Sequence, residues 1–138
     1  MILKMKIGFT GTRNVPTIKQ KRALDVLLMR LDGEYDITEV SHGDCKGSDK
    51  NFHDAVRSLL PKAKINVHPP TDKKHRAFCE GDVMHKEMEY LDRNQAIVDN
   101  SDILIATPKE SSEVLRSGTW ATIRMAKKKG MPVYILNK

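Results

Sequence analysis

Short apolar runs alternate along the chain with longer amphipathic stretches, and this alternation limits the fold more than any other feature. Leu24, Leu27, Leu28 and Leu31 recur at three- and four-residue spacing, which is typical of a helix with one buried face. Strands alternating with such helices form βαβ units and a parallel sheet. The runs predicted to be strands are Met5–Phe9, Ile37–Ser41, Ile65–His68, Asp102–Ala106 and Pro132–Leu136.

Four helices are expected between these strands. The first begins near Pro16 and is stopped by Asp32-Gly33, because proline suits a first helical turn and glycine weakens a helix. The others are predicted at Ser48–Leu60, Glu87–Asp99 and from Gly118 to Gly130. A chain of 138 residues supports one core, so residues 1–138 are expected to form a single domain.

Composition narrows the functional class. The two cysteines, Cys45 and Cys79, are far apart and form no CxxC pair, which favours a reducing cytoplasm over a disulfide framework. No segment has the apolar length of a membrane span. The net charge of +6 favours an anionic ligand. Nucleic acid is a less favoured partner, because the lysines are dispersed and Lys127–Lys129 sits where it complements a helix dipole.

Three loops that follow predicted strands carry small residues directly before a helix. Helix N-termini offer unpaired N–H groups and partial positive charge to a phosphate, and glycine lets the backbone approach closely. Each loop could also be an ordinary turn or helix cap, and none matches GxGxxG or GxxxxGK[ST]. The candidate phosphate-binding residues in these loops are Thr10, Gly11, Thr12, Arg13, His42, Gly43, Asp44, Gly47, Ser48, Asp49, Ser117, Gly118 and Thr119.

The histidines and the acidic residues offer further candidates. The five histidines show no HxxxH or HExxH spacing, so we expect neither a metal site nor a resident cofactor, although His42 and His68 fall at strand ends. Asp49 could hold a ribose hydroxyl or cap a helix. Arg93-Asn94 lies in a predicted helix, flanked by apolar Leu91, Ile97 and Val98.

The loops, read in order, resemble a known family. The segments GFTGTR, HGDCKGSD, YLDRNQAIVDNSDILIA and RSGTWATIRMAKKKGMPV are similar to the SLOG superfamily of Rossmann-like domains, and most similar to its small YspA-like members. The lonely guy phosphoribohydrolases and the DNA-processing protein A domain are relatives. With the rule of right-handed crossovers, the resemblance implies a Rossmann-like, doubly wound, five-stranded parallel sheet of order 3-2-1-4-5. It also implies a homo-oligomer and a nucleotide or nucleotide-derived ligand over the strand ends.

Residue by residue, the resemblance places Arg93 and Asn94 against the ligand. Ser117, Gly118 and Thr119 match part of the phosphate-binding Gly-Gly-x-Gly-Thr segment of the phosphoribohydrolases. Those enzymes carry glutamates where this chain has Ala121 and Thr122. Since glycosidic cleavage needs a carboxylate, binding or sensing is the first reading. The alternative is a nucleoside-monophosphate N-glycosidase that uses a displaced carboxylate from Asp44, Asp49, Glu110 or Glu113.

The sequence also predicts how Arg93 and two polar segments lie around the pocket. Arg93 should point into the pocket, so that replacing it by alanine weakens nucleotide binding about tenfold or more and leaves the fold intact. The polar segments from Pro70 to Met84 and from Pro108 to Ser117 should both lie at the carboxyl edge and form the pocket walls.

Overall fold

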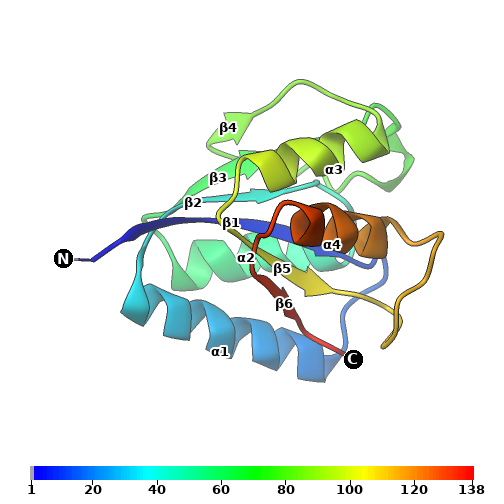
Figure 1. Ribbon diagram of the computed structural model, residues 1–138. Helices are drawn as coiled ribbons and strands as arrows, with labels where there is room; N and C mark the ends of the chain where they lie inside the picture. Colours follow the sequence, from blue (N-terminus) through cyan, green and yellow to red (C-terminus); the bar gives the residue numbers. More distant parts are fainter. Residues whose placement is uncertain (1) are drawn as a thin grey trace.

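The computed structural model describes residues 2–138, and its centre is one sheet in which every strand runs parallel to its neighbours (Figure 1). The strand order is β4-β3-β2-β1-β5-β6. The central strand β1 and its neighbour β5 are almost wholly buried toward their carboxyl ends. The strands are β1 (Lys4–Gly11), β2 (Asp36–His42), β3 (Lys64–Val67), β4 (Val83–Met84), β5 (Ile103–Thr107) and β6 (Val133–Ile135).

The parallel α/β class is confirmed, and the predicted strand count is wrong. The five predicted strands, which are β1, β2, β3, β5 and β6, keep the relative order predicted for them. The sixth strand, β4, was missed because it is two residues long and lies in a polar segment without apolar alternation. Val83 and Met84 pair with Asn66 and Val67 at the free edge of β3.

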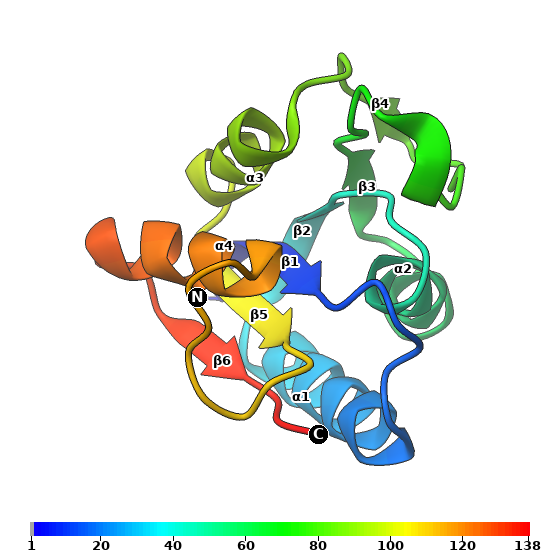
Figure 2. The same ribbon diagram turned by 90° about the vertical axis from the view of Figure 1, so that its right-hand side faces the viewer.

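The helices cover the two faces of the sheet in pairs. In Figures 1 and 2, α1 and α2 lie on one face, and α3 and α4 lie on the other. The larger core packs Leu24, Leu28 and Phe52 of the first pair against Ile7 and Phe9 of β1. The helices are α1 (Ile18–Glu34), α2 (Ser48–Leu59), α3 (Tyr90–Asp99) and α4 (Gly118–Lys128), with a short 3-10 turn, η1, at Lys73–His75.

The boundaries of α1 and α3 differ from the predicted ones, and α2 and α4 end at Leu59 and Lys128 rather than at Leu60 and Gly130. Helix α1 begins at a capping box, in which Thr17 and Gln20 bond each other's backbone N–H groups, and it continues through Gly33 to Glu34. A single glycine costs a helix only about 1 kcal/mol, and the buried leucine face of α1 outweighs that cost. Helix α3 begins at Tyr90 rather than at Glu87.

The carboxyl ends of the strands share one edge, which faces the viewer in Figure 2. The loops leaving β1, β2 and β5 meet there with the first turns of α2 and α4. No helix in residues 2–138 combines the length and the apolar character needed to cross a bilayer.

Candidate functional site

A cleft of about 460 Å³ opens at the carboxyl edge of the sheet. Its floor is the end of β1 and the loop after β2, one wall is α3, and the other is the segment from Lys109 to the start of α4. The lining residues are Phe9, Thr10, Gly11, Thr12, Arg13, Asn14, Gly43, Cys45, Asp49, Tyr90, Leu91, Arg93, Asn94, Ile97, Lys109, Glu110, Arg116, Ser117, Gly118 and Thr119.

The loop after β1 is fixed to its neighbours by its backbone. Thr12 N–H donates to Thr107 O (3.0 Å), and Thr12 O accepts from Ser48 N–H (3.1 Å). A Cβ at Gly11 would collide with the side chains of Ser48 and Thr107, so only glycine fits between these two elements. The loop is therefore held in place at the floor of the cleft, with Arg13 and Asn14 exposed at its rim.

The first turn of α4 presents donors to the same cleft. Ser117 is the N-cap, and its Oγ accepts from Trp120 N–H (3.2 Å). That bond leaves the Gly118 and Thr119 N–H groups as the end of the helix that attracts anions. Gly118 is exposed, with open space where a Cβ would stand. Lys109 and Arg116 add exposed positive charge beside it.

Arg93 is buried at the back of the cleft, and most of its donors are used by the protein. Its Nε donates to Asn94 Oδ1 (2.7 Å), and its Nη1 donates to Gly43 O and to His68 O (3.3 Å). Its Nη2 lies 3.9 Å from Cys45 Sγ, a weak contact that leaves this nitrogen with spare donor capacity. The guanidinium thus joins α3 to the ends of β2 and β3, and its Nη2 can donate to a ligand.

Tyr90 was not predicted as a site residue. Its ring lies beneath two guanidinium groups, with Arg13 at 4.9 Å and Arg93 at 5.5 Å from the ring centre. Both distances are typical of cation–π pairs. The contact sets Arg13 against the α3 wall, where its charge faces the cleft.

Asp49 is the buried acid of the cleft. One carboxylate oxygen accepts from Cys45 N–H (3.1 Å). Burial raises the pKa of Asp49 from its ordinary value of 3.8 to about 6, against the opposing effect of the positive Arg93. The carboxyl group therefore titrates close to neutral pH, and protonation of Asp49 makes the cleft more favourable to an anion.

Replacing Asp49 by asparagine is expected to change the pH dependence of stability. Because folding raises the pKa of Asp49, the protonated carboxyl group contributes fully to the stability of the fold below pH 3.8. This contribution is lost as the pH rises through 6. The loss amounts to at most about 3 kcal/mol. Asp49→Asn keeps an acceptor for Cys45 N–H but does not ionise. Measured by urea unfolding, its free energy of unfolding should therefore rise relative to that of wild type as the pH is raised from 4 to 8. Asp54→Asn, at an exposed site on the same helix, is the control, and an equal pH dependence in both variants would contradict the assignment.

Four of the predicted residues lie outside the cleft lining. The loop after β2 turns inward at Asp44, whose φ is +60°, so that His42 and Asp44 are fully buried beneath it. Asp44 accepts from Arg76 Nε (2.7 Å) and from Cys79 N–H (2.8 Å), which makes it an anchor for the following segment. Gly47, with φ of +83°, caps α2, and Ser48 packs against Gly11.

The remaining candidates divide by position. Thr10, Gly11, Thr12, Arg13, Gly43, Asp49, Arg93, Asn94, Ser117, Gly118 and Thr119 all line the cleft. Of the other proposed carboxylates, Glu110 lines it as well, whereas Glu113 is paired with Arg124 (2.7 Å) away from it. The predicted wall from Pro108 to Ser117 is present in part, since Lys109, Glu110, Arg116 and Ser117 line the cleft. The predicted wall from Pro70 to Met84 is wrong: none of these residues lines the cleft, because the chain there returns to the amino end of the sheet to enter β4, which runs parallel to β3.

The sequence matches no known family profile and no curated protein. Several solved structures share the fold, among them the following three. The molybdenum cofactor binding protein from the phototrophic bacterium Rippkaea orientalis has a TM-score of 0.72 and 20% identity, covering 100% of this chain and 79% of that one. The Moco carrier protein from Chlamydomonas reinhardtii has a TM-score of 0.68 and 15% identity, covering 98% and 78%. TM1055 has a TM-score of 0.63 and 18% identity, covering 94% and 72%.

At these identities the likeness establishes the fold alone. The chain has the Rossmann-like α/β fold of these three proteins, which agrees with the SLOG resemblance at the level of the fold. The narrower YspA-like placement stays a prediction.

Proposed function

We propose that the cleft binds the phosphate of a nucleotide or nucleotide-derived ligand, and that the protein acts as a sensor or binding protein. The observation that carries the proposal is the arrangement of anion-attracting groups from separate elements around one cavity. The N–H groups at the start of α4 face the cleft with Arg13, Lys109 and Arg116 around its rim. Charge-assisted hydrogen bonds from such groups hold a phosphate strongly.

Other features of the cleft fit a ligand with a ring. Phe9 and Ile97 provide apolar surface, and Tyr90 provides an aromatic ring beside the arginines. Ligand pockets commonly combine apolar walls with a few converging polar groups. Two proteins of the same fold are described as molybdenum cofactor proteins, so the molybdenum cofactor is a candidate alongside the nucleotides.

Calorimetric titration with a panel of ligands tests the proposal. The panel pairs each nucleoside monophosphate with its unphosphorylated nucleoside, and it includes the molybdenum cofactor. We expect at least one phosphorylated ligand to bind at least about tenfold more tightly than its unphosphorylated partner, because one charge-assisted hydrogen bond contributes about 1.5–3 kcal/mol. Equal affinity for both members of every pair, with no binding of the cofactor, would overturn the proposal.

A hydrolytic activity is the second candidate, and the acids of the cleft favour it. Asp49 and Glu110 are the carboxylates that line the cavity, and the pKa of Asp49, raised to about 6 by burial, suits proton transfer near neutral pH. If the protein is an N-glycosidase, incubation with nucleoside monophosphates releases free base, and Asp49→Asn or Glu110→Gln abolishes the release. Tight binding with no free base leaves binding as the function.

A further inference from the structure

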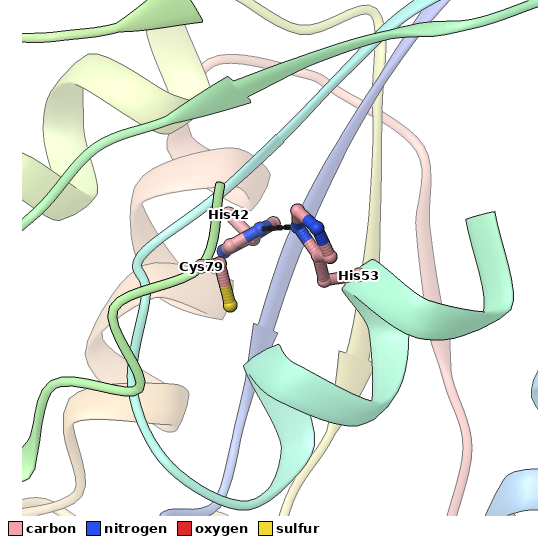
Figure 3. A group of neighbouring side chains, drawn as sticks. All are labelled: His42, His53 and Cys79. Carbon is pink, nitrogen blue, oxygen red and sulfur yellow. Dashed lines mark hydrogen bonds between the residues drawn. The ribbon is translucent and has the colours of Figure 1, made fainter. Parts of the chain in front are cut away.

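We propose that His42, His53 and Cys79 form a second site, buried beneath the loop that lines the cleft, that binds a thiophilic divalent ion such as Zn²⁺. Figure 3 shows the three side chains, which come from the end of β2, from α2 and from the segment before β4: His42 and His53 are joined by a hydrogen bond, and Cys79 lies beside His42. Their ligand atoms all lie within 4.8 Å of each other. No spacing in the sequence marks this cluster, because its members come from three separate segments.

The ligand chemistry selects the ion. One cysteine sulfur and two imidazole nitrogens are a donor set that Zn²⁺ favours, and three protein ligands leave a fourth position open. Zinc–ligand bonds of about 2.0–2.3 Å place tetrahedral donor atoms about 3.3–3.6 Å apart. The nitrogens of His42 and His53 are 2.9 Å apart, so they separate slightly around an ion, and Cys79 closes in by a rotation of its side chain.

The surroundings hold these ligands in place. His42, His53 and Cys79 are only 0%, 6% and 7% exposed. Cys79 N–H donates to Asp44 Oδ1 (2.8 Å), and the other oxygen of Asp44 is held by Arg76 Nε (2.7 Å). Ordered neighbours of this kind fix the orientation of metal ligands.

The proton positions show what the ion replaces. His42 Nδ1 accepts from Asp44 N–H (3.0 Å), so its own proton lies on Nε2 and is donated to His53 Nδ1. Binding of an ion through His42 Nε2 moves this proton to Nδ1, so His42 stays a neutral imidazole and gives up the bond from Asp44 N–H. The Cys79 thiol proton passes to solvent. The thiolate offsets one of the two charges of the ion, and the buried carboxylate of Asp44, which accepts from Cys79 N–H, lies beside it.

Titration with Co²⁺ tests the site, because cobalt adopts the same geometry and is visible in absorption. We expect wild type to bind one Co²⁺ with a thiolate-to-cobalt band in the near ultraviolet and intense visible bands of a four-coordinate ion. Cys79→Ser should lose the near-ultraviolet band. Cys45→Ser, which changes the other buried cysteine, is the matched control and should retain the band. Circular dichroism establishes that both variants fold.

Two results would overturn the proposal. One is a wild-type protein with no thiolate band at excess Co²⁺, and the other is a band that survives Cys79→Ser but disappears with Cys45→Ser. Neither result depends on the ligand of the cleft, so the metal site can be refuted without refuting the proposed function.

Discussion

Replacing Arg93 by alanine is expected to lower the free energy of unfolding by about 3 kcal/mol and to weaken ligand binding at least about tenfold at the same time. The guanidinium is 6% exposed and donates to Gly43 O, His68 O and Asn94 Oδ1. Its removal leaves buried acceptors without donors, and each such group costs about 1–3 kcal/mol. It also removes the positive charge that opposes the effect of burial on the pKa of Asp49. Urea unfolding and calorimetric titration measure the two losses.

This expectation corrects the one drawn from the sequence, in which the variant kept an intact fold. Arg93→Lys separates the effect of charge from that of geometry, since an ammonium group keeps the charge but cannot span the same acceptors. We expect its free energy of unfolding to lie between those of wild type and Arg93→Ala. Arg124→Ala removes a partly buried arginine paired with Glu113 at the surface, and should cost less than about 1 kcal/mol. An unfolding free energy of Arg93→Ala within about 0.5 kcal/mol of wild type would show that the buried network does not stabilise the fold.

Placing a carboxylate at Gly118 is expected to weaken phosphate binding by about a hundredfold without harming the fold. The site is exposed, and no atom lies within 4 Å of the position a Cβ would take. An acidic residue in the first turn of a helix is favourable for the helix itself. A negative charge about 5 Å from a phosphate, however, costs about 3 kcal/mol at an effective dielectric constant near 20. Calorimetry on Gly118→Asp measures the loss of affinity.

Gly118→Asn is the matched control, because it has the same shape without the charge. We expect it to bind within about threefold of wild type, a difference of less than about 1 kcal/mol. If Gly118→Asp and Gly118→Asn bind equally well, the start of α4 does not hold the phosphate, whatever else the cleft binds.

Much of the fold could be predicted because its signals are local. The leucine spacing of α1 and the apolar runs of the larger strands are visible in the sequence, and right-handed crossovers then limit the strand order. The strand β4 could not be found, because two residues at a sheet edge have no period of their own. The end of α1 was misplaced because burial of its leucine face, and not the local preference of Gly33, decides where the helix ends.

The sequence predicted which loops form the candidate site, but not the contacts that join their residues. Loops that follow parallel strands meet at one edge, so Gly11, Arg13 and Gly118 could be placed near each other from topology alone. The inward turn at Asp44 could not be foreseen, because a positive φ at a non-glycine residue is imposed by its neighbours. Tyr90 and Lys109 were not predicted as site residues, because neither lies in a glycine-containing loop. The His42–His53–Cys79 cluster depends wholly on the folded arrangement.

Backbone amide chemical shifts of the protein locate the bound phosphate directly. The phosphorylated ligand that binds most tightly in the panel is titrated into labelled protein, with inorganic phosphate in parallel. We expect the largest shifts at Gly118, Thr119 and the loop from Gly11 to Arg13, and small shifts at β4, which lies far along the sheet. Shifts concentrated away from the cleft, with Gly118 and Thr119 unchanged at saturation, would contradict the proposal that the cleft binds the phosphate.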